Sequence, residues 1–128
     1  NPHCHLVPRG GGGRPNYDSV SVALAEQAMK KHDIPPAIMV DCAHANSWKQ
    51  HALQPRVLAD AVSQIRHGNR SIRAFMLESF IEPGNQSIPA DLSELRYGCS
   101  VTDPCVDWHT TADILRDARA KLRPLLKH

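Results

Sequence analysis

The chain has 128 residues, a formal net charge of +2, 41% hydrophobic residues and 22% charged residues. This length suits one ordinary domain, and this composition is typical of a soluble globular protein. No apolar run approaches the roughly 20 residues that a membrane-spanning helix needs. Basic residues do not gather into a nucleic-acid footprint. These features argue against a membrane role and a nucleic-acid partner, and they leave small anionic substrates open.

The first half of the chain predicts alternating strands and helices. Residues 5–7 are a short apolar run that ends at a proline and a glycine tract, which indicates a strand followed by a loop. Asp18 has the side chain of a helix N-cap, and apolar residues recur after it at helical spacing. They are Val20, Ala23, Leu24 and Ala28. After Pro35 and Pro36, residues 37–40 are continuously apolar, as expected of a strand buried on both faces.

The second half continues this alternation. A helix is expected to restart at Pro55, with an inner face of Val57, Leu58, Ala61, Val62 and Ile65. Residues 72–77 predict a further strand, and residues 82–104 are rich in turn formers and predict a long loop. Thr110 or Thr111 is expected to cap a last helix. Its inward residues are expected to be Ile114, Leu115, Ala118 and Leu122.

This order of elements predicts an α/β fold built from parallel βαβ units with right-handed crossovers. Three parallel strands cannot close into a barrel, and an open sheet would leave apolar strand edges exposed. We therefore expect an incomplete architecture that associates, exchanges elements between copies or rearranges to hide its edges. The chain begins with Asn1 rather than Met and shows no leader sequence, so we expect further chain upstream.

The cysteines indicate the redox environment. Cys4, Cys42, Cys99 and Cys105 form neither paired C-x-x-C knuckles nor a dense secreted framework. Reduced thiols in a cytoplasmic protein are therefore expected.

Three polar side chains follow the predicted strands and could share a metal ion. His44 follows the second strand, Glu78 follows the third, and Asp103 lies in the long loop. Parallel strands of a barrel carry their functional groups at their C-terminal ends. One imidazole and two carboxylates suit manganese, iron, cobalt or zinc better than calcium or magnesium. On this pattern alone a structural role for each residue is the more frequent case.

Arg9 is a candidate anion contact. It stands beside a glycine-rich turn, where a guanidinium and backbone N–H groups can bind phosphate together. The pattern is weak because most surface arginines have no such role.

A series of sequence motifs gives these candidate residues further support. The motifs occupy residues 1–5, 9–11, 15–17, 41–47 with Lys49 and Gln50, 78–79, 82–87, 97–98 and 100–103. In this order they resemble the type I, metal-dependent 3-deoxy-D-arabino-heptulosonate 7-phosphate (DAHP) synthases nearly from end to end. The His-Ala-Asn-Ser-x-Lys-Gln segment starting at His44 and the Glu-x-Gly-Asn-Gln-Ser segment starting at Glu82 are specific to that family.

The resemblance implies both a fold and an activity. Residues 1–128 would be a partial TIM-barrel domain, about the last three βα units of a (β/α)8 barrel and incomplete as they stand. The enzyme would be a transferase that condenses phosphoenolpyruvate with erythrose 4-phosphate and releases phosphate, the first step of the shikimate pathway to aromatic amino acids. A homo-oligomer is expected.

The resemblance also assigns roles to single residues. His44, Glu78 and Asp103 look like three of the family's four metal ligands, and Arg9 looks like a contact to the phosphate of phosphoenolpyruvate. The fourth ligand, a cysteine, lies upstream in the family together with a Lys-Pro-Arg type loop. No cysteine of this chain occupies the matching position, so none is assigned as a ligand. The isolated chain is therefore expected to be inactive and to bind metal weakly.

Two alternatives stay open. Residues 6–10 also resemble an engineered protease-cleavage linker, although the natural motif is favoured because Arg9 and the glycines after it fit the family. The chain could also be a stand-alone metal-binding, anion-binding or regulatory domain without catalysis. A parent gene of roughly 350 residues, the size of a complete barrel enzyme, would favour the enzyme, and a natural start codon before Asn1 would favour the small domain.

Overall fold

The structure is a computed structural model that describes residues 3–125. Its helices and strands are α1 (Ser19–Lys31), β1 (Ile38–Asp41), α2 (Gln54–Arg66), β2 (Ile72–Met76) and α3 (Trp108–Leu122). Short 3₁₀ helices lie at His44–Ser47, His51–Leu53, Leu92–Glu94 and Arg123–Leu125. This order confirms the predicted α/β class. Asn1 and Pro2, which begin the first motif, lie outside the described residues.

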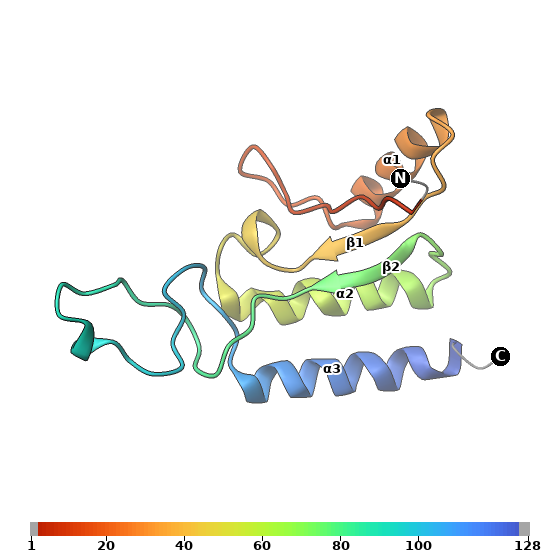
Figure 1. Ribbon diagram of the computed structural model, residues 1–128. Helices are drawn as coiled ribbons and strands as arrows, with labels where there is room; N and C mark the ends of the chain where they lie inside the picture. The colour runs from red at the N-terminus through yellow and green to blue at the C-terminus, as the bar shows by residue number, and fades with distance from the viewer. Residues whose placement is uncertain (1–2, 126–128) are drawn as a thin grey trace.

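The two strands form a parallel sheet. Ile38 pairs with Ile72, and Asp41 pairs with Met76 at the far end of the ladder. Both strands point toward the same end of the molecule, where the turn after β1 and the long loop after β2 lie (Figure 1). Groups that follow the two strands are therefore brought to one edge.

The predicted strand at residues 5–7 is reduced to a single bridge. Leu6 pairs with Ile38 in parallel on the side of β1 away from β2. The N–H of Leu6 donates to the carbonyl of Ala37, and the N–H of Met39 donates to the carbonyl of Leu6, both at 2.9 Å. Pro8 follows immediately and has no N–H to extend the ladder. Within residues 3–125 the sheet has two strands, so these residues do not close a barrel.

The core lies between the sheet and α2. Ile38 and Val40 of β1 are fully buried, as expected for a strand covered on both faces. The predicted inner face of α2 is confirmed, since four of its residues are buried and Ile65 packs against the core from its margin. The four are Val57, Leu58, Ala61 and Val62. α3 lies beside α2, and both helices run back along the strands (Figure 1).

The predicted apolar face of α1 is wrong. Val20 is 67% exposed and Leu24 is 60% exposed, whereas Val22 and Met29 are buried. Both sets follow helical spacing, so periodicity alone does not say which stripe meets the sheet. The predicted N-cap is confirmed, because Asp18 accepts hydrogen bonds from the N–H groups of Val20 and Ser21.

The predicted start of α3 also needs correction. Asp107 is the N-cap, and its Oδ1 accepts the N–H of Thr110 at 2.8 Å. The hydroxyl of Thr111 donates instead to the carbonyl of Asp107, a bond inside the first turn. Asp107, three residues before Thr110, is the N-cap because a charged carboxylate is a stronger acceptor than a hydroxyl at a helix N-terminus. Leu115, predicted inward, is half exposed.

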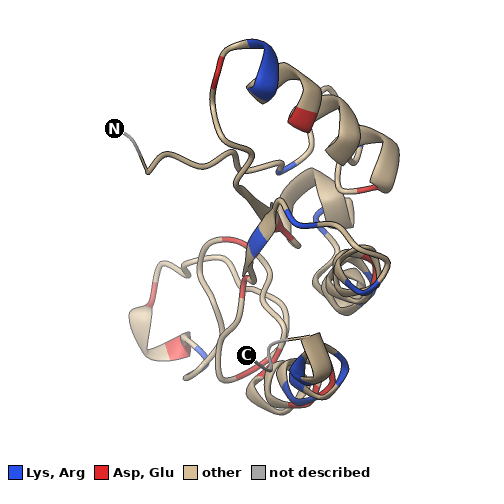
Figure 2. Ribbon diagram, turned by 90° about the vertical axis from the view of Figure 1, so that its right-hand side faces the viewer, with Lys and Arg blue, Asp and Glu red and all other residues tan. Residues whose placement is uncertain are grey.

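The surface carries both signs of charge. Basic and acidic residues are interspersed along the ribbon rather than separated into different parts of the molecule (Figure 2). None of the helices in residues 3–125 is long and apolar enough to cross a membrane.

Gly10 holds the N-terminal segment against the turn after β1. Its φ is +75°, and a Cβ placed on it would lie 2.6 Å from Cβ of Ala45 and 2.8 Å from the carbonyl of Arg14. Only glycine adopts this conformation readily and allows this approach. Residues 6–10 are thus part of the packed structure, which favours the natural motif over a linker.

We predict that Gly10→Ala destabilises the chain by about 2–5 kcal/mol, the sum of left-handed backbone strain and overpacking. Gly12→Ala is the matched control, since its φ is +55° and its Cβ would meet nothing within 4 Å. The control should lose only about 1–2 kcal/mol. Urea unfolding followed by circular dichroism measures both, and equal losses would contradict the close approach.

Candidate metal centre

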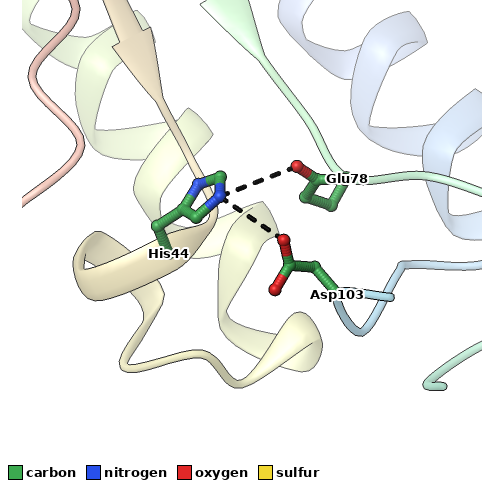
Figure 3. Close-up of side chains that lie close together, drawn as sticks. All are labelled: His44, Glu78 and Asp103. Carbon is green, nitrogen blue, oxygen red and sulfur yellow. Dashed lines mark ion pairs between the residues drawn. The ribbon is translucent and has the colours of Figure 1, made fainter. Parts of the chain in front are cut away.

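The three predicted ligands meet at the end of the sheet. His44 begins the 3₁₀ turn after β1, Glu78 follows β2 by two residues, and Asp103 stands near the end of the long loop. Figure 3 shows both carboxylates on the same side of the imidazole, facing one of its ring nitrogens. The structure therefore brings together three residues that are far apart in the sequence.

The distances suit a shared ion. Nε2 of His44 lies 3.9 Å from Oε1 of Glu78 and 3.6 Å from Oδ2 of Asp103. One ligand atom from each residue lies within 4.8 Å of the others. Two ligands held at about 2.2 Å from one ion lie at most about 4.4 Å apart. The separation between the Glu78 and Asp103 oxygens is at most 4.8 Å, so binding an ion would need at most a small movement. The Asp103 side chain is 54% exposed and has room to make it.

Asp41 orients the imidazole of His44. Its Oδ2 lies 2.7 Å from Nδ1 of His44, and its Oδ1 accepts the N–H of Ala43 at 2.9 Å. Asp41 is buried, so its carboxylate is fixed and needs both partners. The carboxylate of Asp41 accepts a hydrogen bond from an Nδ1–H, so in the neutral ring the lone pair of Nε2 faces the other two carboxylates. A carboxylate behind a histidine is the usual support for a metal ligand.

The turn that carries His44 has an unusual backbone. His44, Trp48 and Lys49 have φ values of 51°, 53° and 57°, in the left-handed region that non-glycine residues seldom occupy. Such strain is retained where surrounding contacts impose it. The buried side chain of Asn46 is one such contact, since its Nδ2 donates to the carbonyls of Pro8 at 2.9 Å and Asp41 at 2.8 Å.

The space between the three side chains is small. His44, Glu78 and Asp103 line a cavity of about 10 Å³ together with Lys49 and neighbouring residues. This volume is about the least that holds one water molecule. A single ion fits such a space, and a larger ligand would have to bind at its mouth.

Arg9 reaches the same region through its backbone. The carbonyl of Pro8 accepts the N–H of Asp41 at 3.2 Å, and Gly10 packs against Ala45. The Arg9 side chain is exposed and makes no hydrogen bond or ion pair with residues 3–125. Its predicted contact to a phosphate stays a prediction.

The cysteines near the site are poor ligands as they stand. Burial raises the pKa of Cys42 to about 12. Burial is also the largest cause that raises the pKa of Cys105, and the charges of Glu78 and Asp103 add to it. A metal-binding cysteine has to be a thiolate. Neither thiol belongs to the cluster of His44, Glu78 and Asp103, and the expectation that no cysteine of this chain is a ligand stays a prediction.

Sequence reasoning missed three supporting residues. From the sequence, Asp41 was recognised only as a polar residue at the end of a strand. A carboxylate three residues before a candidate ligand histidine could have indicated its role. Asn46 and Gln54 are buried, and the carboxamide of Gln54 hydrogen-bonds the N–H and carbonyl of Glu78. A polar residue in a turn or at the first position of a helix gives no sign of burial.

We predict that Asp41→Asn reverses the tautomer of His44. The amide oxygen would keep the bond to the Ala43 N–H, and the amide nitrogen would then donate to Nδ1 and leave the proton on Nε2. Two-bond ¹H–¹⁵N NMR spectra of the ring at a pH where it is neutral report the protonated nitrogen. Asp113→Asn, which breaks an exposed ion pair with Arg116, is the control and should leave the tautomer unchanged. An unchanged Asp41→Asn spectrum would show that Asp41 does not set it.

Comparison with known proteins agrees with the motif series. The family model described as the DAHP synthetase I family matches residues 1–116. The Tyr-sensitive phospho-2-dehydro-3-deoxyheptonate aldolase of Enterobacter agglomerans is 46% identical over 126 residues, covering 98% of this chain and 59% of that protein. The Tyr-sensitive aldolase of Escherichia coli (strain K12) is 45% identical over 122 residues, covering 95% of this chain and 34% of that protein.

A solved structure shares the fold. The phospho-2-dehydro-3-deoxyheptonate aldolase of Francisella tularensis SCHU S4 superposes with a TM-score of 0.89 at 40% identity, over 96% of this chain and 35% of that one. The chain thus spans between about a third and three fifths of the length of these relatives. Since the family model covers nine tenths of the chain and every motif in it, the chain belongs to the DAHP synthetase I family.

Proposed function

We propose that this chain supplies the metal-binding part of a DAHP synthase, which joins phosphoenolpyruvate to erythrose 4-phosphate and releases phosphate. The observation that carries the proposal is the convergence of His44, Glu78 and Asp103 within 4.8 Å at the C-terminal end of two parallel strands. Membership of the family and the names of its relatives support the reaction.

His44, Glu78 and Asp103 would hold one divalent ion through Nε2 and two carboxylate oxygens. Manganese, iron, cobalt and zinc accept this donor set. Such an ion supplies a Lewis acid that polarises the aldehyde of the sugar phosphate, or it positions an activated water. Asp41 contributes by holding the proton on Nδ1, so that Nε2 stays a donor of electrons.

Arg9 would bind the phosphate of phosphoenolpyruvate. Its guanidinium is exposed and has no partner among residues 3–125, and its backbone is packed beside the turn that carries His44. A guanidinium offers two parallel N–H donors to a phosphate and neutralises part of its charge. Bound there, phosphoenolpyruvate would lie beside the candidate ligands, and its enol carbon would form the new carbon–carbon bond with the aldehyde of erythrose 4-phosphate.

The chain would act as about the last three βα units of a (β/α)8 barrel, with residues 1–128 forming part of one domain. The open edge of β2 in residues 3–125 supports this, because a barrel pairs every strand on both sides. Without the upstream cysteine and Lys-Pro-Arg loop of the family, the isolated chain would be inactive. Its free thiols suit the cytoplasm.

A chimera tests the function. In the chimera, this chain replaces the matching segment of the Escherichia coli Tyr-sensitive relative and follows that protein's own preceding part. The chimera should consume phosphoenolpyruvate in a reaction that depends on erythrose 4-phosphate. His44→Ala should lower the rate at least about 100-fold, since loss of a ligand exceeds the 10–100-fold effect of a supporting residue.

His51→Ala is the matched control for the chimera, because His51 lies in the next 3₁₀ helix and outside the ligand set. It should keep most of the activity. A folded chimera that is inactive would favour the stand-alone binding domain, and equal activity of the His44→Ala chimera would remove the metal site from the mechanism.

The isolated chain would also self-associate. The unpaired edge of β2 and exposed apolar side chains such as Val20 and Leu24 favour contact between copies. Multi-angle light scattering should give a molar mass above the 14.2 kDa of a monomer. A monomer at all concentrations that binds no hydrophobic dye would contradict this.

A further inference from the structure

The peptide of Glu78 lies beyond the end of the sheet. The last hydrogen bond between the two strand segments runs from the N–H of Cys42 to the carbonyl of Met76, at 2.9 Å. After Cys42 the chain turns into the 3₁₀ helix His44–Ser47, so it no longer runs beside residue 78. Buried backbone N–H and C=O groups need partners. The backbone of Glu78 must find them elsewhere.

The side chain of Gln54 takes the place of the missing strand. Its Oε1 accepts the N–H of Glu78 at 2.9 Å, and its Nε2 donates to the carbonyl of Glu78 at 3.1 Å. Gln54 is fully buried at the first position of α2. A carboxamide has the same donor and acceptor as a peptide group, so it can extend the ladder by one unit.

The same peptide also anchors the segment that carries Asp103. The carbonyl of Glu78 accepts a second hydrogen bond from the N–H of Val106 at 2.9 Å, and the N–H of Phe80 donates to the carbonyl of Val106 at 3.0 Å. Gln54 stands ten residues after His44, and Val106 stands three residues after Asp103. The backbone N–H and C=O of one residue, Glu78, therefore join the three segments that carry the candidate ligands.

We propose that Gln54 is a positioning residue for the metal site. Its two hydrogen bonds fix the peptide of Glu78 and with it the direction in which the Glu78 carboxylate leaves the backbone, toward Nε2 of His44. The proposal rests on the proposed function, in which these residues share an ion. It requires a two-way hydrogen-bonding group at position 54, whereas a role in packing alone requires only a side chain of the same volume.

Gln54→Met separates these two roles, because methionine fills a similar volume and makes neither hydrogen bond. The probe is Mn²⁺ alone, added to the 128-residue chain and followed by electron paramagnetic resonance of the free ion, with folding checked by circular dichroism. Binding by the unchanged chain is expected to be weak and to be lost in His44→Ala. Gln54→Met should raise the dissociation constant about 10-fold or more.

Gln64→Met is the matched control. Gln64 also lies on α2 and its Nε2 donates to a backbone carbonyl, that of Tyr17, at 2.8 Å, but it has no contact with Glu78. This variant should bind Mn²⁺ like the unchanged chain. Equal weakening by both variants would mean that any lost hydrogen bond on α2 loosens the site, and it would overturn the specific role of Gln54.

A double-mutant cycle tests whether Gln54 acts through Glu78. In the Glu78→Ala background Gln54→Met should cause no further loss of Mn²⁺ affinity, because the group that it positions is gone. Additive losses would overturn the proposal. If Mn²⁺ binding depends on His44 but folded Gln54→Met binds as tightly as the unchanged chain, the role of Gln54 is overturned and the proposed function is not. If the unchanged chain binds Mn²⁺ no more tightly than His44→Ala, the proposed function itself is overturned.

Gln54→Glu covers the case in which Gln54→Met does not fold. Glutamate keeps the size of the side chain and an acceptor for the N–H of Glu78, but as a carboxylate it cannot donate to the carbonyl. Weaker Mn²⁺ binding by the folded variant would support the proposal, because only the bond to the Glu78 carbonyl is lost. Affinity equal to that of the unchanged chain would overturn it.

Discussion

The buried carboxamide of Asn46 is the contact on which the site end of the molecule depends. Its Nδ2 donates to the carbonyls of Pro8 and Asp41, and its Oδ1 accepts the N–H of Asn16. Three segments are thereby tied to one side chain: the end of the N-terminal bridge, the end of β1 and the chain before α1. Removing it would leave buried polar groups without partners and release the turn that carries His44. The left-handed backbone of that turn persists because these contacts outweigh its strain.

The site also has a consistent electrostatic design. Glu78 and Asp103 bring two carboxylates near one imidazole, and Asp41 adds a third behind it. Like charges at this separation repel in a partly buried space, and a divalent cation relieves that repulsion. The exposure of the side chains rises from His44 at 17% through Glu78 at 31% to Asp103 at 54%. Of the three candidate ligands, the histidine is therefore the most firmly held, and the loop aspartate has the most room to move.

Much of this could be predicted from the sequence where a local signal and the tertiary structure agree. The inner face of α2 followed from its period, and the meeting of His44, Glu78 and Asp103 followed from their places after parallel strands. The face of α1 could not be predicted, because Val20 and Leu24 form as regular a stripe as Val22 and Met29, and only the position of the sheet chooses between them. Asp41, Asn46 and Gln54 were missed for a related reason: burial of a polar side chain depends on partners distant in the chain, which no local pattern records.

The long loop after β2 is divided by its own cross-links. Antiparallel bonds join Gly84 to Cys105, and a parallel bridge joins Asn85 to Ser100, so the two arms are held together on the side toward Asp103. The tip of the loop lies beyond these cross-links, around the exposed 3₁₀ helix Leu92–Glu94. Movement at the tip is therefore not passed on to the candidate ligands. Loop length at such a tip costs little free energy. Residues could thus be gained or lost at the tip, and new surface contacts acquired, without a change in the spacing of His44, Glu78 and Asp103.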